Sequence, residues 1–164
     1  MHRAAAPQTL RNWEPPPLPD VIAAVAEDMV AIRALLERAG LPTSDLDSAR
    51  PEFAVIRENG QVIAAGALQR FGSSALLRSV VVAPDRRERG LGHTVVSELE
   101  RLARTARVTQ LVLLTETAAE FFAHQGYRAI ERSSAPGDMQ GSEEFRSLCP
   151  SSASCMAKSL TGPT

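Results

Sequence analysis

The sequence predicts a single α/β domain built around a mixed sheet. Its 164 residues match the size of one domain that can bury a sizeable core without metals or disulfides. Two extended runs, at residues 53–57 and 61–70, are separated by a tight-turn sequence and predict an antiparallel hairpin. Two further apolar runs, at 75–83 and 110–115, lie on either side of the most regular helical pattern in the chain. Strands and helices in this order are typical of an α/β domain.

The composition argues against several classes of function. The chain has 18 basic and 19 acidic residues and a net charge of −1, so no overall basic field attracts nucleic acid or an anionic membrane. Two cysteines, Cys149 and Cys155, are too few for the disulfide framework of a small secreted domain. The sequence shows no signal-peptide core and no stretch of membrane-spanning length. We therefore expect a soluble, cytoplasmic protein.

The chain begins with a proline-rich arm at residues 1–19, which cannot hold a regular helix or a central strand. We expect a first strand at 20–26, although a helix reaching back over these residues is the alternative. The helix that follows has an apolar stripe formed by Met29, Ile32, Leu36 and Ala39. Gly40 and Pro42 end it, and residues 42–48 predict a loop with one helical turn.

The hairpin turn is predicted at Asn59 and Gly60, which tolerate the positive φ angles of a two-residue turn. The next strand, at 75–83, contains a run of valines that suits burial on both faces, and Pro84 ends it. The best-supported helix comes next, with apolar residues at spacings of three or four: Leu91, Val95, Leu99, Leu102 and Ala106.

The last third of the chain predicts shorter elements. A buried strand at 110–115 precedes a short helix at 118–125, which Gly126 ends. We expect strands at 127–134 and 151–160, and an irregular stretch from Ala135 to Pro150 between them.

The stretch "RRERGLG" at residues 86–92 joins the valine-rich strand to the long helix. A helix N-terminus offers unpaired N–H groups and a partial positive charge, so this junction predicts an anion site. Gly90 and Gly92 allow close approach of the backbone, and Arg86, Arg87 and Arg89 add cationic side chains. The alternative is an ordinary helix start with solvated arginines. The patterns GxxxxGK[ST] and GxGxxG of two other phosphate loops are absent.

The pattern Arg87-x-x-Gly90-x-Gly92, after the middle strand and before the long helix, resembles the [Q/R]xxGx[G/A] acyl-CoA signature of the GNAT N-acetyltransferases. The segment "AAEFFAHQGY" at 118–127 resembles a second conserved segment of that family. The resemblance covers residues 20 to about 160. It implies a mixed, mostly antiparallel sheet of six to seven strands with splayed middle strands and about four helices.

The same resemblance implies acetyl-CoA as cosubstrate. The CoA pyrophosphate is then expected on the loop formed by Arg87, Glu88, Arg89, Gly90, Leu91, Gly92 and His93. The pantetheine arm is expected to pair with main-chain groups of Val80 and Val82. Thr115 and Phe122 stand where the family often has a CoA-contacting asparagine and a tyrosine, so the tyrosine hydroxyl is lost here.

The chain bears a closer resemblance to the small arsenic-resistance N-acetyltransferases of arsenic operons. It rests on the segments "AIRALLERAGLPTSDL", "LLRSVVVAP", "LLTETAAEFF" and, above all, "EEFRSLCPSSASCM". This resemblance implies a small-molecule amine as acceptor, in particular an amino-acid-like toxin that carries a phosphinate or arsinate group.

Candidate catalytic residues are few. The strand positions 77–79 lack the carboxylate that many GNAT enzymes place there, and Arg78 cannot act as a base. If it faces the cleft, Arg78 can grip a carboxylate or arsinate-like oxyanion; otherwise it reaches solvent or a structural carboxylate. Glu116 is the candidate proton acceptor, with helix-start stabilisation as the alternative. Glu143 and Glu144 are further candidates unless they belong to a solvated loop.

Other polar residues have simpler interpretations. Tyr127 is expected in the core with its hydroxyl at the edge. His93 either lines the phosphate site or is an exposed helix residue, and His124 suits the negative end of a helix. No histidine pair is spaced for a metal, so none is expected. Cys149 and Cys155 can be soft ligands for trivalent arsenic or, by default, small buried residues.

These observations leave two functions open. The first is an acetyl-CoA-dependent N-acetyltransferase that acts directly on a small amine, with neither nucleic acid nor membrane as partner. The second is a non-catalytic acyl-CoA-binding or arsenic-binding sensor on the same fold. Because GNAT domains often pair, the resemblance also implies a homodimer to which the arm contributes.

Overall fold

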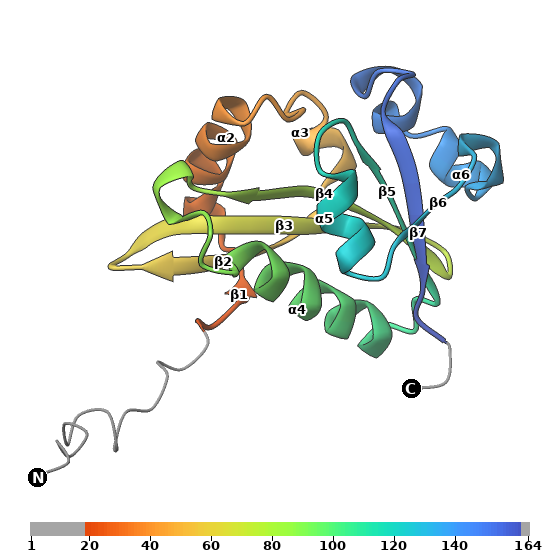
Figure 1. Cartoon of the computed structure of the whole chain (residues 1–164). Coiled ribbons are helices and arrows are strands. Elements are labelled where there is room, and N and C mark those ends of the chain that lie inside the picture. Colours follow the sequence, from red (N-terminus) through yellow and green to blue (C-terminus); the bar gives the residue numbers. More distant parts are fainter. Residues whose placement is uncertain (1–18, 162–164) are drawn as a thin grey trace, which may run out of the picture.

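Residues 19–161 are described by the computed structural model of the chain, shown in Figure 1. Apart from Pro19, the arm expected at 1–19 lies outside the described residues. The chain forms a seven-stranded sheet in the order β1-β2-β3-β4-β5-β7-β6. β4 and β5 pair in parallel, and all other neighbours pair antiparallel. The prediction of a mixed, mostly antiparallel sheet is therefore confirmed.

The strands are β1 Ile22–Ala23, β2 Glu52–Glu58, β3 Gln61–Phe71, β4 Ser74–Val82, β5 Gln110–Thr115, β6 Arg128–Ala129 and β7 Ser154–Ser159. The α-helices are α2 Met29–Arg38, α3 Leu46–Ala49, α4 Leu91–Thr105, α5 Ala119–His124 and α6 Gly137–Gln140. Across residues 19–161, no helix is both long enough and apolar enough to cross a membrane.

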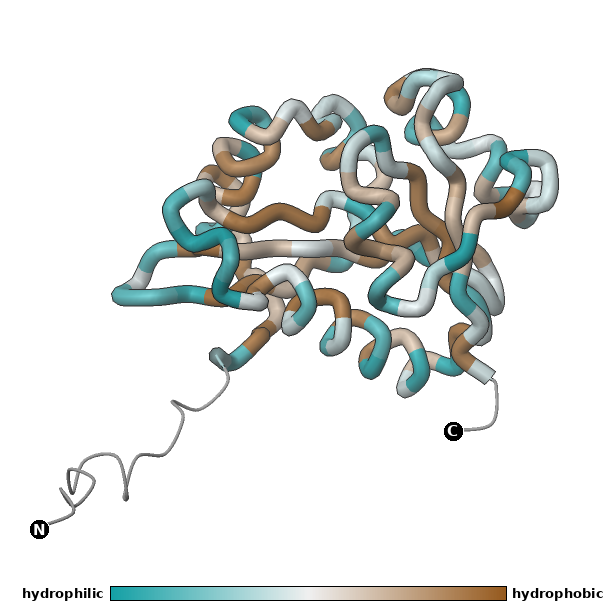
Figure 2. The backbone as a smooth tube through the Cα atoms, viewed as in Figure 1, coloured by the Kyte–Doolittle hydropathy of each residue, from teal (hydrophilic) through white to brown (hydrophobic). Residues whose placement is uncertain are grey.

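Helices cover both faces of the sheet. In Figure 1, α2 and α3 lie on one face and α4 on the other. The main core lies between these helices and the central strands. Figure 2 shows the central strands as mainly hydrophobic and the tip of the β2–β3 hairpin as hydrophilic.

A second, smaller core joins β4, β5 and β7 to residues 130–153, which we call the β6–β7 segment. Its buried members are Leu76, Val112, Ala135, Met139, Phe145, Cys155 and Ala157. This core explains why the stretch predicted to be irregular contains α6 and a single π-helical turn, Glu144–Leu148. Residues 135–150 form these helical turns because Met139 and Phe145 are buried in this core, and such packing stabilises short helices.

The first and sixth strands are shorter than predicted. β1 pairs with β2 only at Ile22 and Ala23, and a 3₁₀ turn, Ala26–Asp28, leads directly into α2. The Asp28 carboxylate accepts a hydrogen bond from the Val25 N–H at 2.8 Å, which stabilises a turn where the predicted strand would continue. The alternative, a helix reaching back over residues 20–26, is correct only for Ala26. β6 likewise covers two residues instead of the predicted eight.

The hairpin and the long helix follow the sequence closely. Asn59 and Gly60 have φ angles of 53° and 78°, as a type I′ turn requires. In α4, Val95 and Leu99 are fully buried, but Leu102 is 38 % exposed. Ala103 is buried in its place, because the buried face of α4 is wider than the predicted stripe and also includes Val96 and Glu100.

One buried polar network ties α4 to the end of the chain. Glu100 accepts a hydrogen bond from the Tyr127 hydroxyl at 2.9 Å and contacts Lys158 Nζ at 3.0 Å. Tyr127 is 4 % exposed, and burial raises the pKa of its hydroxyl. The expectation that Tyr127 is a core residue is confirmed, with a buried carboxylate as the partner of its hydroxyl.

Candidate functional site

β4 and β5 diverge halfway along their length. They pair at only three positions: Ser74↔Gln110, Ala75↔Leu111 and Leu76↔Val112. β4 nevertheless continues to Val82, and β5 continues to Thr115 while pairing with β7 along its whole length. We call residues 77–82 the open stretch of β4, because they have no partner on β5. The predicted splay of the middle strands is therefore present, and Val80 and Val82 lie in it.

A β-bulge lies within the open stretch. On β3, Ala65 pairs with Val81 and Ala67 pairs with Arg78, so Gly66 alone faces both Ser79 and Val80. Ser79 has a φ of 59°, a left-handed conformation that costs a non-glycine residue about 1 kcal/mol or more. A bulge takes local main-chain groups out of the ladder and re-aims them. Here this happens next to the point where β4 leaves β5.

The arginine loop, residues 86–92, connects β4 to α4. Glu88 and Gly90 have φ angles of 69° and 75°, and Gly90 precedes the first helical residue, Leu91. No side chain caps this helix start, so its first N–H groups and the positive end of its dipole face outward. A Cβ atom on Gly90 would have no neighbour within 4 Å, so the space around it is open. This geometry suits an anion held mainly by backbone.

The three arginines of the loop differ in their partners. Arg86 Nε lies 2.9 Å from one oxygen of Glu58, and Arg89 Nη2 lies 3.1 Å from the other. Hydrogen bonds from Arg89 and Arg86 lower the pKa of Glu58. Arg87 is exposed, and within residues 19–161 its side chain makes only a long contact, 3.4 Å, to the carbonyl oxygen of Val82. Arg87 is therefore the loop arginine whose charge is available to a ligand.

The aromatic ring beside the loop belongs to Phe121 and not to Phe122. A Cβ atom on Gly92 would lie 3.3 Å from the Phe121 ring. Phe122 is 7 % exposed and packs edge-to-face against Tyr127, with 5.7 Å between the ring centroids. Successive helical residues point about 100° apart, so burial of one ring turns the other toward the loop. The ring of Phe122, which we expected at the cofactor, is part of the core.

Thr115 and His93, two residues that we expected at the cofactor, contact the two ends of α5. The Thr115 hydroxyl accepts a hydrogen bond from the Ala118 N–H at 3.0 Å, at the start of α5. The exposed His93 ring contacts the side chain of Gln125, at the end of α5. Both residues therefore brace α5 near the arginine loop.

Arg78 is buried in an ion pair and does not face an open cleft. Its Nη1 and Nη2 atoms each lie 2.6 Å from the Asp45 carboxylate, just before α3. Gln69 Oε1 accepts a further hydrogen bond from Nη1 at 3.0 Å. The Arg78 side chain is 0 % exposed. Burial opposes its charge, but the hydrogen bonds to Asp45 raise its pKa. Of the two roles that the sequence left open for Arg78, the structure therefore supports contact with a structural carboxylate and not the gripping of an external oxyanion.

Glu144 lies on the remaining side of Arg78. It belongs to the π-helical turn, is 5 % exposed, and places Oε1 3.7 Å from Arg78 Nε. Burial raises the pKa of Glu144 to about 7, against the opposing effect of Arg78. Its neighbour Glu143 is exposed, so the solvated-loop interpretation holds for Glu143 alone.

The remaining candidate residues are Glu116 and the two cysteines. Glu116 is exposed directly after β5. Burial raises the pKa of Cys149 to about 12 and also raises that of Cys155, so neither thiol is a ready thiolate ligand at neutral pH. No group of three or more metal-ligating side chains occurs in the described part of the chain.

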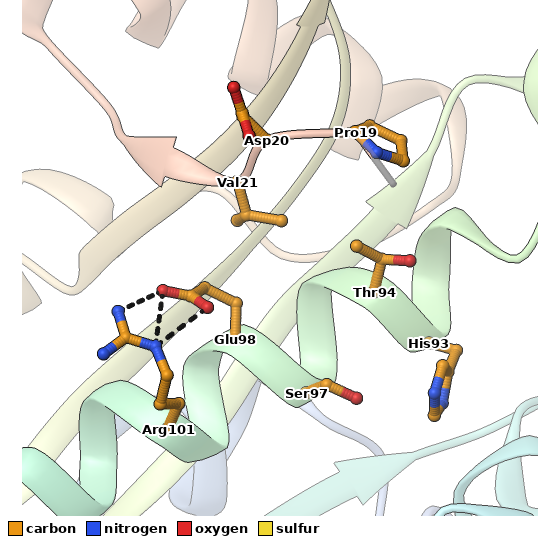
Figure 3. Close-up of a pocket in the computed structure, with 8 residues that line it drawn as sticks. All are labelled: Pro19, Asp20, Val21, His93, Thr94, Ser97, Glu98 and Arg101. Carbon is orange, nitrogen blue, oxygen red and sulfur yellow. Dashed lines mark hydrogen bonds and ion pairs between the residues drawn. The ribbon is translucent and has the colours of Figure 1, made fainter. Parts of the chain in front are cut away.

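The surface also has a pocket outside the splay. It has a volume of about 460 Å³ and lies between Pro19–Val21 and the exposed side of α4. Figure 3 shows the Glu98–Arg101 pair at one end of it and His93 at the other. Its lining includes no residue of the open stretch of β4, so we base the site on the splay and the arginine loop.

Sequence reasoning missed four residues that shape this site: Asp45, Glu58, Ser79 and Phe121. Glu58 is the last residue of β2, next to the predicted turn, and Asp45 lies in the predicted loop. Acidic residues are common at such positions, so neither residue could be recognised in the sequence as part of the site. No residue type marks the bulge at Ser79. The choice between Phe121 and Phe122 required the rotation of α5.

Comparison with known proteins agrees with this geometry. Residues 49–129 match the family described as Acetyltransferase (GNAT) domain. An amino-acid acetyltransferase of Aliivibrio fischeri is 28 % identical over 119 residues, which are 71 % of this chain and 25 % of the relative. An amino-acid acetyltransferase of Mycobacterium tuberculosis is 35 % identical over 94 residues, 56 % of this chain and 50 % of the relative. The chain thus spans a quarter to a half of these relatives.

Solved structures show the same architecture. A Mycobacterium tuberculosis protein in complex with CoA superposes with a TM-score of 0.73 at 27 % identity, over 86 % of this chain and 99 % of the other. The N-acetylglutamate synthase of Neisseria gonorrhoeae, complexed with coenzyme A and N-acetyl-glutamate, superposes with a TM-score of 0.74 at 19 % identity, over 86 % of this chain and 35 % of the other. The shared architecture shows that the chain has the GNAT fold, and residues 49–129 match the GNAT acetyltransferase domain.

Proposed function

We propose that the protein is an acetyl-CoA-dependent N-acetyltransferase that acts on the amine of an amino acid. The observation that carries this proposal is the open stretch of β4, which leads directly into the uncapped N-terminus of α4. An unpaired strand edge and an anion-binding helix start, joined end to end, suit a long ligand that has amide groups at one end and phosphates at the other. Coenzyme A is such a ligand.

The residues present fit acetyl-CoA as substrate. The loop backbone from Arg87 to His93 would meet the pyrophosphate, with Arg87 as the unpaired cation. Main-chain groups of Val80 and Val82 would pair with the pantetheine arm. When bound, the cosubstrate supplies an activated thioester.

The chain's own contribution is mainly positional. Holding an amine against an electrophile in a fixed orientation supplies a large part of such a rate enhancement. The main chain at the Ser79 bulge is re-aimed beside the splay, where N–H donors can meet developing negative charge. The buried ring of Phe122 donates no proton, so a water or the substrate itself protonates the leaving thiolate.

The acceptor class rests on the relatives. The matching curated proteins from Aliivibrio fischeri and Mycobacterium tuberculosis are amino-acid acetyltransferases, which favours an α-amino acid. The segments that resemble the arsenic-resistance N-acetyltransferases favour, within that class, a glutamate-like toxin bearing a phosphinate or arsinate group, and with it a role in arsenic resistance. Both acceptors present the same α-amine, so one assay separates them.

A second candidate function is a non-catalytic acyl-CoA-binding sensor. The observation that favours it is the apolar ring of Phe122, which is buried where the family often has a tyrosine. We also propose a cytoplasmic location, in which Cys149 and Cys155 stay reduced as they are here.

The deciding experiment measures thiol release from acetyl-CoA across amino acids and glutamate analogues with phosphinate or arsinate groups. We expect turnover with at least one α-amino acid. Tight CoA binding without turnover on any amine would favour the sensor.

The cofactor site is tested by calorimetry on Gly90→Glu, with Gly72→Glu as matched control. Both glycines have positive φ angles, 75° and 62°, and open space around them, so the two changes add the same strain and charge. Only the first lies in the arginine loop. We expect Gly90→Glu to abolish acetyl-CoA binding and Gly72→Glu to preserve it; equal affinities for the two variants would refute the loop assignment.

A further inference from the structure

The Arg78 Nε atom is buried without a hydrogen-bond partner in residues 19–161, and the Glu144 carboxylate lies beside it. The distance from Nε to Oε1 is 3.7 Å, which is too long for a hydrogen bond and too short for a water between them. Arg78 Nε is a buried donor with no acceptor in the described part of the chain. Buried charged groups are nearly always hydrogen-bonded, so the unpartnered Nε atom beside the Glu144 carboxylate calls for an explanation.

The position of the pair connects it to the splay. Arg78 is the second residue after Leu76, where pairing with β5 ends, and the last residue before the bulged Ser79. Leu76 and Arg78 point to the same face of the sheet, which the β6–β7 segment covers. Glu144 therefore stands over the point where β4 opens, on the face away from α4.

The charge balance of this cluster leaves Glu144 free to change its protonation state. The Arg78 charge is already paired with Asp45 through two contacts of 2.6 Å. Besides these two groups, the Cys149 thiol and the Arg132 guanidinium lie on neighbouring parts of the β6–β7 segment, and Arg132 is hydrogen-bonded to the carbonyl oxygen of Phe145. Burial raises the pKa of Glu144, Arg78 lowers it and Asp45 raises it, with a result of about 7.

We propose that Glu144 is the base that accepts the proton of the acceptor amine, an inference that rests on the proposed function. As the amine nitrogen forms its bond to the acetyl carbon, the carbon–sulfur bond breaks and sulfur leaves with the electron pair as the CoA thiolate. One N–H proton passes to a Glu144 oxygen and later to solvent. A base whose pKa lies near the working pH combines the ionised form with a useful affinity for protons. The role moves from the exposed Glu116 to a residue contributed by the β6–β7 segment.

The test is the pH dependence of kcat for the full chain and for Glu144→Gln. Glutamine has the shape of the protonated side chain, so the fold is expected to persist. We expect kcat to fall roughly 10²-fold, with little change in KM for acetyl-CoA. The wild-type kcat should rise with pH and level off near the pKa of Glu144, whereas in the variant it should keep rising until the amine itself loses its proton. Glu131→Gln, an exposed glutamate of the same segment, is the matched control and should behave as wild type.

Each outcome decides between the roles. A purely structural Glu144 predicts an unchanged pH profile in the variant, and that result overturns the proposal while leaving the acetyltransferase function intact. Absence of turnover in the wild type on every amine overturns both. Infrared difference spectra of wild type against Glu144→Gln provide a readout that needs no turnover: a carboxyl band that titrates near neutrality supports the proposal, and one that titrates near the ordinary pKa of glutamate overturns it.

Discussion

Gly66 of β3 lies directly beneath Leu99 of α4, so closely that a Cβ atom on Gly66 would come within 2.8 Å of Leu99 Cδ1. The same atom would lie 2.8 Å from Val95 and 3.4 Å from Val80. Gly66 is also the single residue that faces the bulge at Ser79 and Val80. The close approach of α4 and the shape of the open stretch of β4 therefore depend on the same missing side chain.

Replacement of Gly66 by alanine is expected to destabilise the fold by about 1–3 kcal/mol, because an added methyl group must push α4 off the sheet. Chemical denaturation measures the loss. Gly137→Ala is the control, since a Cβ there meets nothing within 4 Å and the residue has no positive φ. The two variants having the same stability would contradict the packing argument.

Arg87→Ala and Arg89→Ala should weaken acetyl-CoA binding unequally. Arg87 has no carboxylate partner within residues 19–161, whereas Arg89 pairs with Glu58. A charge-assisted hydrogen bond contributes about 1.5–3 kcal/mol, so we expect Arg87→Ala to weaken binding roughly tenfold or more. Arg89→Ala should cost less, because its charge is already partly neutralised. Calorimetry at two salt concentrations checks this, and a larger loss for Arg89→Ala would refute the assignment.

The raised pKa of Glu144 predicts a stability that falls with rising pH. Its ordinary pKa is 4.5 and its pKa in the folded protein is about 7. Between these values the folded state binds more protons than the unfolded state, so the stability linked to protonated Glu144 is present below pH 4.5 and is lost as pH rises through 7. Glu144→Gln should therefore gain stability relative to wild type, by up to about 3 kcal/mol, as the pH is raised from about 5 to about 8.

Thermal unfolding of the two proteins at both pH values measures this difference. Glu131→Gln again serves as control and should show no such trend. A stability difference between Glu144→Gln and wild type that stays constant with pH would mean that Glu144 ionises at its ordinary pKa in the folded protein.

The fold was predictable wherever local chemistry decides the backbone. The turn at Asn59–Gly60, the helix ends at Gly40 and Gly126, and the arginine loop each follow from residues that tolerate positive φ angles or offer a free helix start. The first strand was predicted too long, because the cap that Asp28 provides is a side-chain effect outside the pattern of apolar residues. The predicted irregular stretch is partly helical. Its turns are stabilised because Met139 and Phe145 are buried against β4, β5 and β7, which lie far away in the sequence.

The candidate site divides in the same way. The sequence by itself determined the arginine loop and its glycines, because a helix start with these residues offers N–H donors and positive charge wherever it is placed. Only the tertiary structure decided that Arg78 donates two hydrogen bonds to Asp45, which lies 33 residues away in the sequence. It likewise decided that Glu144 is buried on the other side of Arg78. Only the tertiary structure showed that Glu58 holds two of the three loop arginines. Local spacing sets backbone conformation, whereas the partner of a charge and the pKa of a carboxylate depend on which distant segments pack around it.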